Sequence, residues 1–90
     1  MRFEWDPRTA ASNKRKHGVS FEEAATSFAD PAGLLLEDKA HSERAVLIGV
    51  SRRLRVLFTV FVELEEDLVR IITARKATRK ERRRYEEEAQ

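Results

Sequence analysis

The spacing of apolar residues changes once along this chain, at segment 30–33 (Asp-Pro-Ala-Gly). Before that segment, four apolar residues stand at positions i, i+3, i+4 and i+7 and form one stripe of an amphipathic helix: Phe21, Ala24, Ala25 and Phe28. After it, the apolar residues gather in short runs separated by polar turns, as in β-strands. Helices in one block and strands in another predict an α+β fold.

Residues that start and end helices mark the two N-terminal helices. Asp6 is an N-cap acceptor in front of Pro7, a residue favoured at the first helical position. Gly18 is suited to end that helix because glycine adopts the left-handed conformation without penalty. Ser20 and Glu23 form a capping box, in which each side chain accepts a free backbone N–H, and this box opens the second helix.

A third helix is expected at the C-terminus, where Thr78 and Glu81 form a second capping box. Its body, residues 82–88, is almost wholly polar and has no apolar stripe. Most helical stability in proteins comes from packing an apolar face, so we expect this helix on the edge of the sheet or ordered by a partner. Tyr85 either covers the sheet edge or stacks on a nucleic-acid base.

Five runs of residues are predicted as strands: 3–5, 34–36, 45–50, 54–63 and 68–75. Short loops between consecutive strands favour an antiparallel meander. The predicted fold is therefore α+β, an antiparallel four- to five-stranded sheet with two N-terminal helices packed on one face and a C-terminal helix.

Side chains in the run 54–63 alternate between the two faces of the predicted sheet. The even-numbered residues are expected to pack on the helices: Leu54, Val56, Phe58, Val60 and Val62. The odd-numbered residues are expected to form a mixed working surface: Arg55, Leu57, Thr59, Phe61 and Glu63.

Length and composition exclude several classes of protein. The 90 residues suffice for one small domain, spanning 1–90. The absence of cysteine excludes disulfides, thiolate nucleophiles and thiolate metal sites. No apolar run approaches the roughly 18 residues that cross a membrane, and the N-terminus lacks a secretory apolar segment. We therefore expect a cytoplasmic protein without membrane contacts.

The basic charge is concentrated near the C-terminus. The whole chain carries 18 basic and 16 acidic residues, a net charge of +2. The stretch from Arg70 to Arg84 alone holds eight basic residues and one acid. Such a concentration is typical of nucleic-acid binding, although a charged run is also an ordinary solvated helix face. Lys14, Lys16 and the arginines 82–84 are expected to contact phosphates or an acidic partner.

The reactive residue types favour RNA cleavage without a metal. The two histidines have no metal-ligand spacing, and the chain has no nucleophile elbow or phosphate loop. Cleavage of RNA needs neither a metal nor a nucleophile from the protein, because the 2′-hydroxyl of the RNA can attack the adjacent phosphate. The protein must then offset charge and move protons. Arg55, Arg75 and Arg79 are predicted to converge near strand ends and supply the charge.

His17 is the candidate general acid or base, because histidine is the side chain most often used to transfer protons near neutral pH. The alternative is a histidine that interacts with the carbonyl groups at the end of its helix. Two other functions fit the same basic surface: a noncatalytic nucleic-acid-binding or transcriptional partner, and a protein-interaction module that binds an acidic partner.

An ordered set of short motifs resembles the BrnT toxin family from Phe3 to Tyr85. The N-terminal matches are Phe3-Glu4-Trp5-Asp6, Asn13-Lys14, Lys16-His17-Gly18-Val19, Phe21-Glu22 and Ala24-Ala25. The later matches are Glu43-Arg44, Gly49 with Ser51, Arg70-Ile71-Ile72, Ala74-Arg75-Lys76-Ala77, Glu81-Arg82 and Tyr85. The chain departs from the family pattern at Leu54, where a hairpin glycine is common, and at the apolar stretch 60–62.

This resemblance implies a RelE-like endoribonuclease toxin of a type II toxin–antitoxin module, which acts without a cofactor and inhibits translation. It implies a BrnA-like antitoxin, a ribbon-helix-helix DNA-binding protein that brings the toxin to operator DNA only as a complex. The implied catalytic residues are His17, Lys14, Arg55, Arg75 and Arg79. The resemblance also implies Thr59 as a site residue on the same strand as Arg55. Together with the cations and the aromatic residue selected above, the predicted RNA-binding residues are Lys16, Thr59, Arg82, Arg83 and Tyr85.

Overall fold

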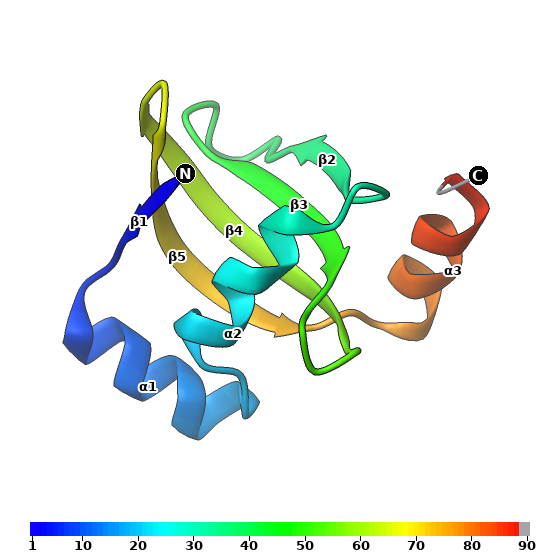
Figure 1. Ribbon diagram of the computed structural model, residues 1–90, viewed down its shortest axis with the longest axis horizontal. Coiled ribbons are helices and arrows are strands. Elements are labelled where there is room, and N and C mark those ends of the chain that lie inside the picture. Colours follow the sequence, from blue (N-terminus) through cyan, green and yellow to red (C-terminus); the bar gives the residue numbers. More distant parts are fainter. Residues whose placement is uncertain (89–90) are drawn as a thin grey trace.

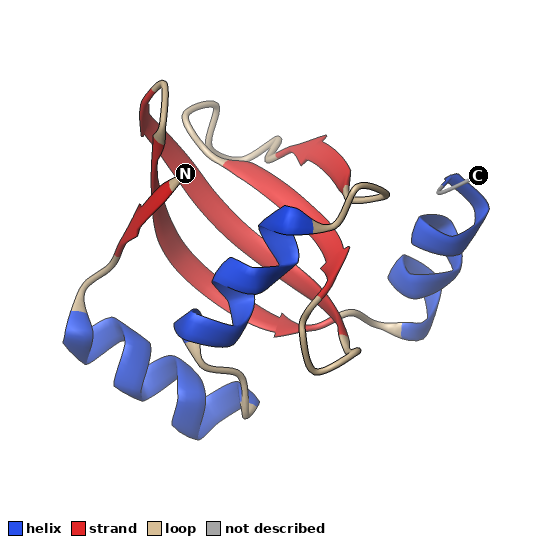
Figure 2. Cartoon of the chain, viewed as in Figure 1, coloured by secondary structure: helices blue, strands red, loops and turns tan. Residues whose placement is uncertain are grey.

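A computed structural model describes residues 1–88 as a five-stranded sheet with helices on both sides (Figures 1 and 2). The strands are β1 (Arg2–Glu4), β2 (Leu34–Glu37), β3 (Ala45–Val50), β4 (Val56–Glu65) and β5 (Leu68–Lys76). The helices are α1 (Pro7–His17), α2 (Phe21–Thr26), the short 3-10 helix η1 (Ser27–Ala29) and α3 (Arg79–Glu88). These elements confirm the predicted α+β class, and every predicted strand and helix is present.

The sheet is mixed, which corrects the expectation of a purely antiparallel one. Its strand order is β1-β5-β4-β3-β2. The four later strands pair antiparallel, but β1 pairs parallel with β5, with Phe3 opposite Val69. The reason is the chain path, because α1 and α2 carry the chain across the sheet between β1 and the meander (Figure 1).

Local capping explains why α1 has its observed bounds. The Asp6 carboxylate accepts hydrogen bonds from the backbone N–H groups of Arg8, at 2.8 Å, and Thr9, at 3.3 Å. At the other end Gly18 adopts the left-handed conformation, with φ of 70°, and its N–H donates to the Lys14 carbonyl at 2.8 Å. Both ends of this helix match the prediction.

The first face of the sheet carries the main core under α1 and α2. Its fully buried members include Val19, Phe21 and Ala24 from the helical half, with Leu57 and Ile71 from the strands. The odd-numbered residues of β4 thus face these helices, which reverses the prediction. The alternating pattern could not choose a face, because both faces of this central strand are covered.

The second face carries a smaller core that α3 closes. Val46, Ile48 and Val60 form its buried centre, and Phe58 and Tyr85 pack against it. The expectation that the helices group on one face is therefore wrong for α3, which lies apart from the other two helices in Figure 1. The Tyr85 ring is thus the apolar contact by which the polar helix α3 packs on the sheet.

Asn13 fixes α1 against the part of β5 that β1 does not cover. Its side-chain amide donates to the Val19 and Ala74 carbonyls, at 3.0 and 2.8 Å. Its carbonyl oxygen accepts from the Ala74 N–H and the Thr73 hydroxyl, each at 3.1 Å. Because Ala74 exchanges both backbone groups with one buried side chain, Asn13 takes the place of a neighbouring strand. The N-terminal basic helix is thereby held along β5.

Candidate functional site

A basic hollow of about 470 Å³ lies where β5 ends and α3 begins. Four cationic side chains line it: Arg55, Lys76, Arg79 and Arg82. The other lining residues are Leu54, Val56 and Ala77, so the wall contains no acidic side chain. A concave surface with this charge is suited to bind a phosphate group.

The turn between β3 and β4 sets the position of Arg55. The Ser51 N–H donates to the Arg55 carbonyl at 2.8 Å, and the Leu54 N–H donates to the Ser51 carbonyl at 2.8 Å. Leu54 has a φ of 64°, and it is the one non-glycine residue among 1–88 in the left-handed region. The hairpin glycine that the resemblance led us to expect would adopt this conformation at little cost. The chain therefore keeps the turn but strains its backbone at Leu54.

A buried ion pair holds Arg55 toward the first face. Arg55 Nε donates to Glu23 Oε2 at 2.9 Å, and Arg55 Nη2 bonds the other carboxylate oxygen. The Ser51 hydroxyl also donates to Glu23 Oε2, at 2.7 Å. The Arg55 bonds lower the pKa of Glu23 despite its burial, and the same pairing raises the pKa of Arg55. Arg55 is thus a fixed, permanently charged group at the rim of the hollow.

A second ion pair holds Arg75 on the other face. Its guanidinium binds the Glu81 carboxylate at both nitrogens, at 2.7 and 3.0 Å, and lies 4.0 Å from the centre of the Phe58 ring. Hydrogen bonds from Arg75 lower the pKa of Glu81. The predicted convergence of three arginines is therefore only partly observed, since Arg55 and Arg79 share the hollow and Arg75 does not line it.

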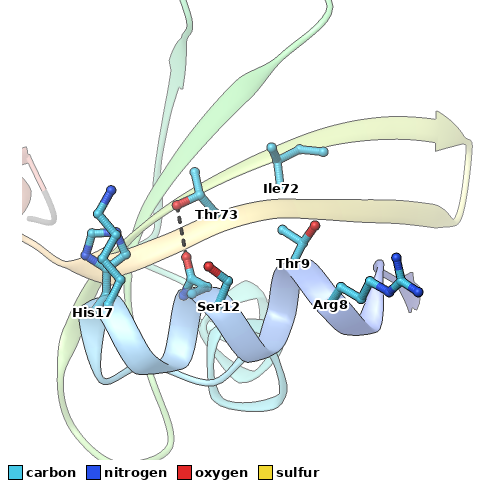
Figure 3. A pocket seen from close by; sticks show the side chains of 8 residues that line it. Arg8, Thr9, Ser12, His17, Ile72 and Thr73 are labelled. Carbon is cyan, nitrogen blue, oxygen red and sulfur yellow. Dashed lines mark hydrogen bonds between the residues drawn. The ribbon is translucent and has the colours of Figure 1, made fainter.

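His17 and Lys16 line a separate groove of about 360 Å³ between α1 and β5 (Figure 3). This groove has no lining residue in common with the basic hollow. The end of α1 does contact a residue of the hollow, because the carbonyl of Gly18, which follows His17, accepts from Arg55 Nη2 at 3.1 Å. Within residues 1–88 the His17 ring makes no hydrogen bond or ion pair that would fix it to the end of α1. The structure thus places His17 in this groove, one residue before the Gly18 carbonyl that Arg55 contacts.

Two residues predicted to bind RNA have other roles in the fold. Thr59 is fully buried, and its hydroxyl has no hydrogen-bond partner among the described residues. The Tyr85 hydroxyl donates to Asp30 Oδ2 at 2.5 Å. Burial and this bond raise the pKa of Tyr85 to about 12. Burial favours a higher pKa for Asp30, but the bonds it accepts outweigh that effect and lower it. Thr59 is thus enclosed in the core, and Tyr85 packs on the sheet with its hydroxyl bound to Asp30.

The other candidate residues are exposed, and three further residues of the site were not selected from the sequence. Lys14 is exposed on α1, as Arg83 is on α3. Glu23, Ser51 and Lys76 also shape the site but were not predicted. Glu23 was assigned only a capping role, and its bond to Arg55, 32 residues away, has no local signal in the sequence. Residues 1–88 form no group of three histidine or acidic side chains that could hold a metal, and contain no helix long and apolar enough to span a membrane.

Comparison with known proteins identifies the family. The model of the ribonuclease toxin BrnT of type II toxin–antitoxin systems matches residues 5–81. The chain belongs to the BrnT toxin family. A BrnT protein is a ribonuclease toxin of such a system, and a toxin of this kind has an antitoxin partner.

A solved structure supports the fold. The crystal structure of the Brucella abortus ribonuclease toxin BrnT matches with a TM-score of 0.71 and 22% sequence identity. The match covers 88% of this chain and 99% of that one. A search of curated protein sequences gave no significant match. The α+β architecture described above is therefore the BrnT fold.

Proposed function

We propose that this BrnT toxin is an endoribonuclease that cleaves RNA by attack of its 2′-hydroxyl and needs no metal. The observation that carries this proposal is the basic hollow, where four cations meet and no acid lines the wall, with His17 in the groove between α1 and β5. A phosphate in that hollow would be surrounded by positive charge that is already in place before the reaction. Such preorganised charge is the main way in which enzymes stabilise a developing anion.

The residues divide the chemistry between charge and proton transfer. Arg79, Arg82 and Lys76 contact the scissile phosphate and offset the charge of its pentavalent transition state. Arg55 adds a fixed charge at the rim, because Glu23 and the Gly18 carbonyl hold its guanidinium. His17 exchanges protons with the attacking or leaving oxygen, and Lys14 is the alternative donor on the same helix.

The remaining predicted residues act around this centre. Arg83 and Lys16 contact phosphates on either side of the cleaved bond. Arg75 acts indirectly, because its pairing with Glu81 sets the start of α3, from which Arg79 and Arg82 extend. We place the reaction in the cytoplasm, where cleavage of RNA inhibits translation. A BrnA-like ribbon-helix-helix antitoxin neutralises the toxin, and the toxin reaches operator DNA only in that complex.

A cleavage assay tests the proposal. Purified toxin, stripped of any antitoxin, is mixed with total RNA with and without EDTA, beside Arg79→Ala and His17→Gln. We expect cleavage to survive EDTA and to fall by about 100-fold in Arg79→Ala, the cost of one donor to a developing anion. Arg52→Ala removes the same charge from the turn without touching the hollow, so it should cleave normally.

The same assay distinguishes a noncatalytic nucleic-acid-binding function. This alternative is favoured by one observation, that Arg55 and Arg75 are already paired with carboxylates. A folded protein that binds RNA with strong salt dependence but never cleaves it would establish the alternative. Equal activity in Arg79→Ala, His17→Gln and the unmodified toxin would contradict the proposed site.

A further inference from the structure

The groove along α1 is a second basic depression, separate from the hollow. It extends from His17 back to Arg8, near the start of the helix (Figure 3). Its wall combines cations with hydroxyl groups, namely Arg8, Lys16, Thr9, Ser12 and Thr73. The wall has no acidic residue, and α1 itself contains none. This groove therefore offers hydrogen-bond donors and positive charge along its whole length.

The spacing on the helix makes the groove a linear array. Arg8, Ser12 and Lys16 follow one another at intervals of four residues and so lie on one side of α1. At a rise of about 1.5 Å per residue the two cations are roughly 12 Å apart along the axis. Phosphates follow at roughly 3.4 Å along one stacked strand, so this distance spans about three of them.

These cations are available for binding, unlike most of the arginines near the sheet. Within residues 1–88 the side chains of Arg8 and Lys16 make no ion pair and no hydrogen bond. By contrast, Arg55, Arg70 and Arg75 are each paired with a glutamate. The chain therefore neutralises several arginines that pack on the sheet and leaves the cations of α1 unpaired.

The groove is also a fixed shape. Asn13 lies on its floor, and all of its hydrogen bonds go to the backbone and to Thr73. Register with β4 shifts between Val60 and Phe61, which leaves Ile72 without a partner in that strand, and Ile72 is one of the residues that line the groove. Because Asn13 ties α1 to β5, the groove exists before any ligand arrives, and binding requires little reordering.

We propose that this groove is a track for the sugar–phosphate backbone of single-stranded RNA, leading to the basic hollow. Arg8 and Lys16 bind phosphates, and the Thr9 and Ser12 hydroxyls bind phosphate or ribose oxygens. The proposal rests on the proposed ribonuclease function and names the path of its substrate. The groove offers hydrogen-bond donors and cations but no acidic side chain, so it disfavours a positively charged ligand. The regular spacing of Arg8, Ser12 and Lys16 along α1 suits a ligand with regularly spaced phosphates.

Binding of an uncleavable strand tests the track separately from cleavage. The probe is a fluorescein-labelled 2′-O-methyl oligoribonucleotide, which lacks the attacking hydroxyl, and its anisotropy is measured over a range of salt concentrations. The test variant is Arg8→Gln/Lys16→Gln of the full chain. The matched control is Lys39→Gln/Arg52→Gln, which removes one lysine and one arginine outside the groove.

We expect the slope of log K against log salt to fall by about 1.4 in the test variant, or 0.7 for each lost phosphate contact on a single strand. The control should keep the slope of the unmodified toxin, and thermal unfolding should show that both variants fold. Equal slopes in the test and control variants would overturn the track. Binding of a polyglutamate peptide in place of the oligonucleotide would overturn it too, in favour of an acidic protein partner. Normal track binding without cleavage of ordinary RNA would instead contradict the ribonuclease proposal.

Discussion

The Ser/Thr-x-x-Glu pattern occurs twice in this molecule, at the start of α2 and at the start of α3, and the two copies behave differently. At α3 the box is complete, since the Glu81 N–H donates to Thr78 Oγ1 at 3.2 Å and the Thr78 N–H donates to Glu81 Oε1 at 2.8 Å. At α2 only one half forms, with the Glu23 N–H donating to Ser20 Oγ at 3.0 Å. The Glu23 carboxylate instead binds Arg55 and Ser51.

The difference follows from where each glutamate lies. Glu23 is only 7% exposed, so its charge requires a partner that is also out of water. Glu81 is half-buried, and it can cap its helix and bind Arg75 together. The same local pattern therefore joins α2 to the turn that carries Arg55, but only steadies the start of α3. The comparison predicts that the two ion pairs contribute very different amounts to stability.

The largest effect is expected for Glu23→Gln. Loss of the buried carboxylate leaves Arg55, which is 26% exposed, without its charged partner, and this should lower the free energy of unfolding by about 3 kcal/mol. Urea unfolding followed by circular dichroism measures this change. Glu22→Gln alters an exposed neighbour on the same helix and should change stability little. Equal stability of the two variants would show that the buried pair does not hold the fold.

The pH dependence of stability should report the same pair. Hydrogen bonds from Arg55 lower the pKa of Glu23 below 4.5, and those from Arg75 lower the pKa of Glu81. Each carboxylate therefore stabilises the fold fully above pH 4.5, and that stability is lost as the pH falls through the lowered pKa. Urea unfolding at several acidic pH values should show this loss. We expect a smaller loss in Glu23→Gln, and an unchanged loss would contradict the assignment.

Leu54→Gly tests the turn that carries Arg55, because it removes the backbone strain at the left-handed residue. A leucine in the left-handed conformation is strained and a glycine is not. We therefore expect the free energy of unfolding to rise by about 1 kcal/mol, after subtraction of the extra conformational entropy that glycine gives the unfolded chain. Leu64→Gly is the control, since Leu64 is exposed in β4 without a positive φ. It should destabilise. A loss of stability in Leu54→Gly would mean that the leucine side chain contributes more than its backbone strain costs.

The smallest effect is expected for Glu81→Gln. An ion pair near the surface is worth at most about 1 kcal/mol, and the amide can still accept part of the capping interaction. The free energy of unfolding, measured with urea, should therefore fall by less than about 1 kcal/mol. Hydrogen exchange of the backbone amides in α3 should become faster. Glu88→Gln breaks an exposed pair with Arg84 at the far end of the helix and serves as the control. A cost as large as that of Glu23→Gln would remove the distinction between the two pairs.

Local signals in the sequence predicted most of the fold. The Asp6-Pro7 start, Gly18 and both capping boxes correctly placed the helices, because caps act through atoms a few residues away. The face of β4, the parallel pairing of β1 and the position of α3 were not predicted. Each depends on contacts between residues far apart in the chain, such as Tyr85 with Asp30. Such contacts produce no repeating pattern in the sequence. The family resemblance supplied the fold and the class of function that composition alone left open.

The candidate site was harder to predict than the fold. The sequence pointed to arginines by their charge, but charge does not reveal which of them a carboxylate neutralises. Arg55 and Arg79 line the hollow as expected, whereas Arg75 binds Glu81 and stacks on Phe58. The role of Glu23 stayed hidden because its helix-start position already had a sufficient local explanation.

Metal-independent cleavage by the 2′-hydroxyl of RNA can be tested through the chemical identity of the new RNA ends. A defined RNA is cleaved by the purified toxin in EDTA, and the fragment ends are identified by mass spectrometry. Attack by the 2′-hydroxyl predicts a 2′,3′-cyclic phosphate on one fragment and a 5′-hydroxyl on the other, with no loss of cleavage in EDTA. Fragments that end in a 3′-hydroxyl and a 5′-phosphate, or cleavage that EDTA abolishes, would contradict the account.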